Sequence, residues 1–115
     1  MKFVLLIYRN APPELGLPAA AERAAVARHR KLQTEAAREV VSVARLDDAR
    51  TARTVRKQAT GHAATDGPFP ETKEWLVGFY LLDCASLADA EARAAAIADE
   101  HHVVEVRPAT WAKAR

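Results

Sequence analysis

The chain has 115 residues, enough for one domain with a modest core but too few for two. Its 17 basic and 15 acidic residues leave a net charge of +2, which argues against nucleic acid and against an acidic membrane surface as partners. Half of the residues are hydrophobic, and the single cysteine, Cys84, excludes an internal disulfide and favours a reducing, cytoplasmic location.

The first predicted element is a strand at residues 2–8, followed by a proline-rich loop. Both faces of this strand are apolar, which is typical of a central strand covered on both sides. The apolar run is too short for a signal peptide or a membrane span. We therefore expect a buried strand and no contact with a membrane.

A helix is predicted from about residue 19 to residue 39, because Pro18 suits the start of a helix. At about 100° per residue, one stripe of this helix gathers its apolar side chains together with a histidine. That stripe consists of Ala25, His29, Leu32 and Ala36.

Residues 40–46 form a second predicted strand, and residues 51–57 with 61–65 form a polar hairpin. This region is locally basic. It either meets an acidic protein or nucleic acid, or is a solvated edge, and the lack of interleaved aromatic residues favours the solvated edge. The basic residues are Arg45, Arg50, Arg53, Arg56 and Lys57.

Residues 65–83 join a turn to the most strand-like run of the chain. Asp66, Gly67 and Pro68 favour a tight turn, since aspartate can bond nearby backbone N–H groups, glycine permits positive φ and proline fixes φ. The alternating residues of 75–82 are apolar on both faces, so both faces should be covered.

A second helix is predicted from Leu87 to about Glu100, after a capping box at residues 86–89. Its buried stripe should consist of Leu87, Ala90, Ala94 and Ile97. A last strand follows at residues 102–107 and is stopped by Pro108, and the tail that carries Trp111 should be frayed or docked on a partner.

This order of elements predicts an α+β fold for residues 1–115 as a single domain. Two strand–helix–strand units side by side give a ferredoxin-like split βαβ arrangement with an antiparallel sheet and an inserted hairpin. The helices then cover one face of the sheet. Because the strands are apolar on both faces, we expect a second copy of the chain to cover the other face in a homodimer.

The string DGPFPETKEWLVGFYLLD at residues 66–83 resembles the signature of the YCII-related family, also called DGPF-domain proteins. KFVLLIY at 2–8, the helical HRKL at 29–32, RTVR at 53–56 and VVEVRP at 103–108 match in order and spacing. The resemblance implies a dimeric α/β barrel, a recurrent histidine and aspartate that suggest an enzyme, and an association with extracytoplasmic-function sigma factors.

His29 and Asp66 are the candidate catalytic pair. A carboxylate that holds one ring nitrogen of a histidine fixes its tautomer and raises its basicity, as a general base requires. His29 matches the helical histidine of the family by position, and the family's acidic partner corresponds either to Asp66 or to a position near Asp99. The competing interpretations are a half-buried histidine with satisfied hydrogen bonds and an aspartate that only closes its own turn.

Candidate substrate-binding residues follow the same turn: Phe69, Glu71, Lys73 and Tyr80. The charged ones either line the mouth of a cleft or belong to a solvated loop. Tyr80 either presents its hydroxyl to the cleft or is a core aromatic with a satisfied O–H, and the second is the more common case.

No metal or nucleotide cofactor is expected. His101 and His102 are adjacent, so in a strand they point to opposite sides and cannot chelate one metal together. The glycines are scattered rather than gathered in a phosphate-binding loop. Cys84 follows the acidic Asp83, which would raise the pKa of its thiol and disfavour a nucleophilic role.

Two functions remain. The first is a cytoplasmic, cofactor-independent enzyme that uses His29 and Asp66 on an unidentified small organic molecule. The alternative is a non-catalytic binding or regulatory module linked to sigma-factor-dependent transcription, which would use the basic hairpin or the edge of the sheet.

Overall fold

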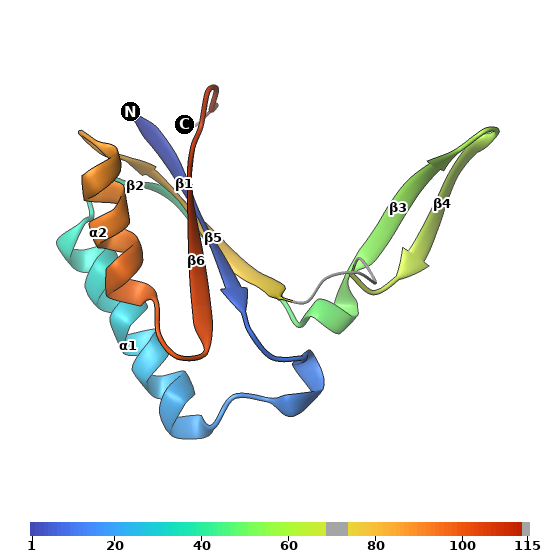
Figure 1. Ribbon diagram of the computed structural model, residues 1–115, viewed down its shortest axis with the longest axis horizontal. Helices are drawn as coiled ribbons and strands as arrows, with labels where there is room; N and C mark the ends of the chain where they lie inside the picture. The colour runs from blue at the N-terminus through green and yellow to red at the C-terminus, as the bar shows by residue number, and fades with distance from the viewer. Residues whose placement is uncertain (69–73, 114–115) are drawn as a thin grey trace.

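A computed structural model gives the structure of the chain and describes residues 1–68 and 74–113. The fold is α+β, with six strands and two α-helices in the described residues (Figure 1). In chain order these elements are β1 (Lys2–Arg9), α1 (Ala19–Glu35), β2 (Val40–Arg45), β3 (Arg53–Gln58), β4 (Gly61–Asp66), β5 (Trp75–Asp83), α2 (Leu87–Ile97) and β6 (His102–Pro108), with short 3-10 turns at Pro13–Leu15 and Ala49–Thr51.

Four strands form the main sheet in the order β2-β5-β1-β6, and every neighbouring pair is antiparallel. The units β1-α1-β2 and β5-α2-β6 therefore interleave, since each skips over one strand of the other unit. This is the strand order of a ferredoxin-like fold, as the sequence predicts.

Both helices pack on the same face of this sheet (Figure 1). The buried side chains of β1 and β5 alternate along their strands, because successive strand residues point to opposite faces. The predicted histidine-containing stripe of α1 does face inward, with Leu32 and Ala36 buried. The largest fully buried side chains of the core are Phe3, Leu5, Tyr80, Leu82 and Ile97.

Strands β3 and β4 form a separate two-stranded sheet, which we call the arm (residues 53–66). The arm projects away from the sheet and helices (Figure 1). Its base is closed by the Gly67 N–H, which donates to the Ala52 carbonyl oxygen at 2.6 Å, and by the Thr54 hydroxyl, which donates to the Gly67 carbonyl oxygen at 2.6 Å. Val55, in contrast, is 62% exposed.

The ends of the helices differ from the prediction. Helix α1 stops at Glu35 rather than at residue 39, because the chain turns over residues 36–39 and Glu39 already bonds the sheet through Asp83. Helix α2 stops at Ile97, because Asp99 pairs with His102 in a tight turn. Leu87, predicted to be buried, is 45% exposed. Strand β3 begins at residue 53, since residues 49–51 form a 3-10 turn capped by Asp48.

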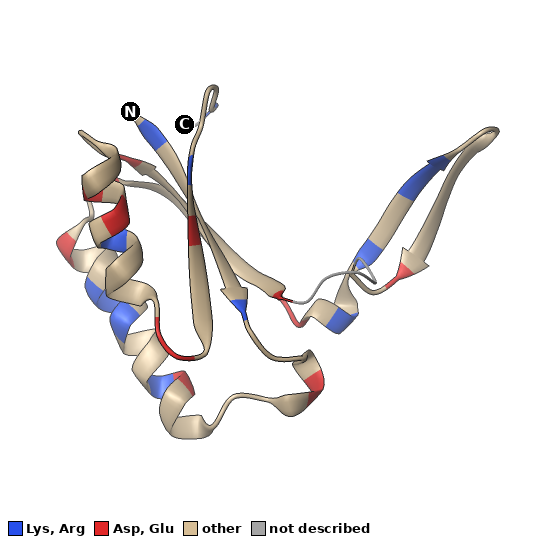
Figure 2. Ribbon diagram, in the orientation of Figure 1, with Lys and Arg blue, Asp and Glu red and all other residues tan. Residues whose placement is uncertain are grey.

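Charged residues are sparse along the middle of the central strands and frequent on the helices and at strand ends (Figure 2). The Ser86 hydroxyl caps α2 by accepting from the Asp89 N–H at 3.2 Å, which confirms the first half of the predicted capping box. Neither helix in the described part of the chain combines the length and the apolar character needed to cross a bilayer.

Candidate functional site

A cavity of about 440 Å³ lies between helix α1 and the sheet. Its walls come from β1, α1, β2 and β5, and from His102 at the start of β6. Gly78 of β5 forms part of the lining where β2 approaches closely, since a Cβ atom there would lie 2.7 Å from the Ala44 carbonyl oxygen. The apolar lining includes Ile7, Leu17, Val26, Val43, Leu46 and Val77, and the polar lining includes His29, Gln33, Tyr80 and His102.

His29 meets Tyr80 inside this cavity. Its Nδ1 lies 2.7 Å from the Tyr80 hydroxyl oxygen, and the two rings are nearly parallel with centroids 5.7 Å apart. The Gln33 side-chain amide also donates to the Tyr80 hydroxyl at 3.1 Å. Tyr80 is fully buried and its oxygen accepts from Gln33, so its O–H needs an acceptor, and His29 Nδ1 is the acceptor within reach. We therefore assign the proton of neutral His29 to Nε2.

Burial keeps both rings of this pair neutral. Desolvation lowers the pKa of His29, and the positive charges of His102, when that ring is protonated, and of Arg28 lower it further, while Asp99 acts in the opposite direction. Desolvation raises the pKa of Tyr80, and the bond from Gln33 only partly opposes that rise. At neutral pH the pair is an uncharged imidazole bonded to an uncharged phenol.

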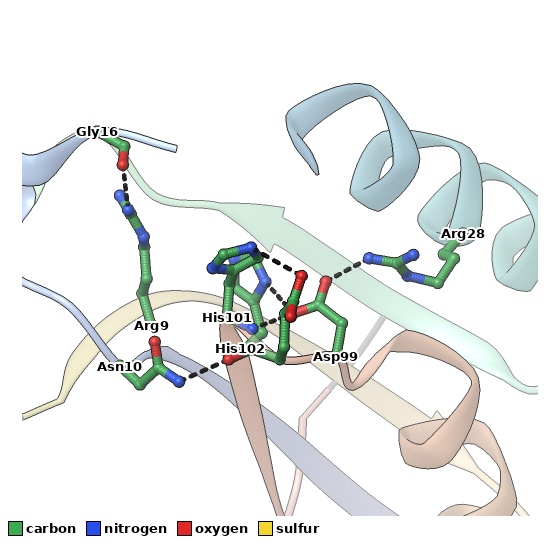
Figure 3. Close-up of polar contacts among 8 residues, drawn as sticks. Arg9, Asn10, Gly16, Arg28, Asp99, His101 and His102 are labelled. Atoms are coloured by element: carbon green, nitrogen blue, oxygen red, sulfur yellow. Dashed lines mark hydrogen bonds and ion pairs between the residues drawn. The ribbon is translucent and has the colours of Figure 1, made fainter. Parts of the chain in front are cut away.

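A second histidine lines the same cavity and is held by a carboxylate (Figure 3). His102 Nδ1 lies 2.9 Å from Asp99 Oδ1, and the same carboxylate accepts from the His101 N–H at 2.7 Å and from the Arg28 guanidinium. Burial alone would raise the pKa of Asp99, but the bonds from His101 and His102 and the charge of Arg28 outweigh it and leave the pKa lowered.

The ionised Asp99 carboxylate can only accept hydrogen bonds, so the ring of His102 must donate from Nδ1. This leaves the lone pair of neutral His102 on Nε2. The cavity thus contains one histidine whose Nε2 donates, His29, and one whose Nε2 accepts, His102. Such a pair can take a proton from one atom of a bound molecule and stabilise negative charge on another.

Asp66 is not brought to His29. Its side chain is 87% exposed on the arm and pairs with Arg53, whose Nη1 lies 2.5 Å from Asp66 Oδ1. Asp66 does not line the cavity, and His29 is bonded to Tyr80 instead. The predicted contact between the candidate catalytic pair is therefore absent, whereas the acidic position near residue 99 contributes to the cavity through His102.

The other predicted site residues divide in two. Tyr80 lines the cavity and is at the same time a core aromatic with a satisfied hydroxyl, so both interpretations describe it. Phe69, Glu71 and Lys73 lie outside the described residues. Within residues 1–68 and 74–113, no three His, Cys, Asp or Glu side chains converge as a metal site would require.

The position of His102 next to His101 in the sequence does not by itself indicate a role in the cavity. The signal in the sequence is the spacing Asp-x-x-His directly after a helix, because the carboxylate can then cap the turn and reach the histidine ring at the same time.

Cys84 is buried. Burial and, after it, the Glu39 carboxylate raise the pKa of the Cys84 thiol to about 12. The sequence predicts that Asp83 raises this pKa, whereas in the structure the cause is burial together with Glu39.

The sequence of the chain is similar to those of known proteins. The model of the YCII-related domain matches residues 1–109. An uncharacterized protein of Rhizobium meliloti (strain 1021) is 56% identical over 48 residues, which are 42% of this chain and 39% of the relative. The chain therefore aligns with well under half of the length of this curated relative.

Proposed function

The chain belongs to the YCII-related family, and from that premise we propose that it is a cofactor-independent enzyme that moves a proton on a small organic molecule. The observation that carries the proposal is the presence of two histidines in one cavity, each held by a different kind of partner. The buried and unpaired Cys84 suits a reducing cytoplasm, which we include in the proposal.

The two histidines have complementary roles in this proposal. His102 is the general base, because Asp99 holds its Nδ1–H and leaves the lone pair on Nε2. His29 donates from Nε2 to the atom on which negative charge develops, because Tyr80 occupies its Nδ1. Arg28 keeps Asp99 ionised and is a positioning residue.

A nitrobenzisoxazole tests the base without knowledge of the natural substrate. When a base removes its ring C–H proton, the N–O bond breaks, and the single product is a coloured nitrophenolate that carries the new nitrile group. We expect the wild-type protein to catalyse this reaction, and His102→Gln to slow it by about a hundredfold. His29→Gln should also slow it, since the new phenolate oxygen loses its donor.

His62→Gln is the matched control, because His62 is an exposed histidine on the arm. The proposal is wrong if the wild-type protein is no faster than imidazole at the same concentration. It is equally wrong if His102→Gln and His62→Gln behave alike while both remain folded by circular dichroism.

We also propose that the protein is a homodimer that pairs the sheet face opposite the helices, here called the open face. Because Phe3, Leu5 and Ile7 point to the core, the alternate residues of β1 point the other way, as do their direct partners on β5 and β6. The open face contains Val4, Leu6, Tyr8, Phe79, Leu81 and Val103, together with the ion pair of Glu105 and Arg107 on β6. Covering a second apolar sheet face is what the dimeric barrel of the family resemblance requires.

Analytical ultracentrifugation tests this dimer. The wild-type protein should sediment as a dimer at micromolar concentration, and Leu81→Glu should sediment as a monomer, since a carboxylate in a buried interface is strongly unfavourable. Val55→Glu on the arm is the control and should leave the dimer intact. A wild-type monomer at these concentrations would contradict the proposal.

The arm favours a second candidate function, a regulatory module that binds an extracytoplasmic-function sigma factor. The arm projects away from the main sheet and the helices, and Arg53 and Lys57 lie on one face of it together with their cross-strand partners Asp66 and His62. Titration of such a purified sigma factor should show binding that Arg53→Glu with Lys57→Glu abolishes. Unchanged binding by this double variant would remove the arm as the contact.

A further inference from the structure

The cavity carries an excess of positive charge that the proposed proton transfer does not use. Three arginines, Arg9, Arg30 and Arg45, line it against one glutamate, Glu22, an excess of two positive charges. The two histidines add no charge while they are neutral. A cavity with apolar walls and this balance attracts a molecule that is both apolar and anionic.

The three arginines differ in how their charge is compensated. Arg45 is paired with Glu22, at 2.7 Å between Nη2 and Oε1, and Arg30 is exposed to solvent. Arg9 is half-buried, and no carboxylate of the described residues pairs with it. Among the described residues neither Arg9 nor Arg30 has a counter-charge, and of the two only Arg9 is shielded from solvent.

The position of Arg9 is nevertheless fixed. It is the last residue of β1, and its Nη2 donates to the Gly16 carbonyl oxygen at 2.6 Å, so the loop after β1 holds the guanidinium (Figure 3). Its Nε is buried and has no hydrogen-bond partner in the described part of the chain. Because Nε has almost no accessible surface, a ligand would bind the guanidinium at Nη1, which makes no hydrogen bond within the described residues.

We infer that the substrate is a small organic carboxylate and that Arg9 binds its carboxylate group. The N–H groups of Nη1 can donate to a carboxylate oxygen in a charge-assisted hydrogen bond. The hydrocarbon part then lies against Ile7, Val43 and Val77, which share the cavity with the two histidines. This inference rests on the proposed function, because it names the substrate class of the same site.

Isothermal titration calorimetry with benzoate and with its neutral amide, benzamide, tests the role of Arg9. The wild-type protein should bind benzoate about tenfold more tightly than benzamide, as expected for one charge-assisted contact. Arg9→Gln should abolish this preference while it leaves benzamide affinity unchanged, and Arg9→Lys should retain part of it. Arg23→Gln, an exposed arginine of α1 outside the cavity lining, should behave as wild type.

Three results would overturn the inference: equal affinity of the wild type for both probes, no binding of either at millimolar concentration, or an equal loss of preference in Arg9→Gln and Arg23→Gln. Since calorimetry measures no turnover, the result is independent of the nitrobenzisoxazole assay. A carboxylate preference without catalysis would refute the enzyme and keep the binding site. Catalysis without a preference for benzoate would refute the carboxylate-binding site and keep the enzyme.

Discussion

The four-stranded sheet and the two-stranded arm are both antiparallel, yet they are stabilised in different ways. The sheet buries side chains such as Phe3, Leu5 and Leu82 under two helices. In the part of the chain that the structure describes, no layer packs on the arm, and apart from Thr54 at its base none of its residues is buried. Cross-strand pairs alone stabilise a ribbon only marginally. The free energy of unfolding therefore depends mainly on apolar burial in the four-stranded sheet, and only slightly on the charged arm that carries part of the sequence motif.

The largest expected effect sharpens this contrast. Leu5→Ala removes a fully buried side chain from the centre of the sheet and should lower the free energy of unfolding by about 2–5 kcal/mol. Val55→Ala, at the exposed centre of β3, should lower it by less than about 0.5 kcal/mol. Urea denaturation of both variants measures the difference, and comparable losses would show that the arm is packed in solution.

A smaller effect is expected where the cavity relies on a charge. Asp99→Asn weakens the bonds from Arg28 and His102, and should cost about 1.5–3 kcal/mol at neutral pH. The folded-state pKa of Asp99 lies below its ordinary value of 3.8, so its contribution is present above that value and is lost as pH falls through the lowered pKa.

Unfolding measured from about pH 7 to pH 2 should therefore show the wild-type and Asp99→Asn curves converging in acid. Asp66→Asn, at an exposed carboxylate of the arm, provides the comparison variant and should unfold at nearly the same denaturant concentration as wild type at pH 7. A constant gap between the wild-type and Asp99→Asn curves would mean that the carboxylate contributes by shape alone.

The next effect concerns a neutral bond in the cavity. Tyr80→Phe removes the hydroxyl that joins His29 to Gln33, and should cost about 1 kcal/mol. Without its hydrogen bond, His29 should also lose the preference for the Nε2–H tautomer. Nitrogen-detected NMR of the imidazole measures that preference, and an unchanged tautomer would contradict the assigned roles of the two histidines.

The smallest effect is expected on the arm. The pair between Arg53 and Asp66 joins two largely exposed side chains, and such pairs contribute about 0–1 kcal/mol. Arg53→Ala should accordingly change the midpoint of thermal unfolding little, and less at high salt. A loss as large as that of Asp99→Asn would show that the arm and the cavity are comparable after all.

The strands and helices were predictable because each depends on neighbours within a few residues. The apolar alternation of residues 2–8 and 75–82 and the stripe containing His29 all match the structure. The order of the elements then led to the ferredoxin-like arrangement. Helix ends were less predictable, because Glu39 and Asp99 turn the chain through contacts with distant residues and tight turns rather than through a local stop signal.

Only part of the candidate site could be predicted, because its residues come together through contacts between segments that are distant in the sequence. His29 was found from the helical stripe and from the family resemblance, but its partner was sought in the most distinctive motif, which ends on the arm. Tyr80 on β5 bonds His29, and His102 on β6 lines the same cavity, and the pairing of those strands is set by the whole sheet. No spacing in the sequence shows which strand will lie under a given helix.

The strand order also has a kinetic consequence. Lys2 pairs with Asp83 and Phe3 with Pro108, so the central strand β1 acquires both of its neighbours only from the second half of the chain. Closing such long loops is slow compared with forming a helix, and an emerging chain would present β1 unpaired until β5 and β6 follow. During synthesis this apolar strand is therefore the segment with the longest exposure to aggregation, and the one that a chaperone would be expected to shield.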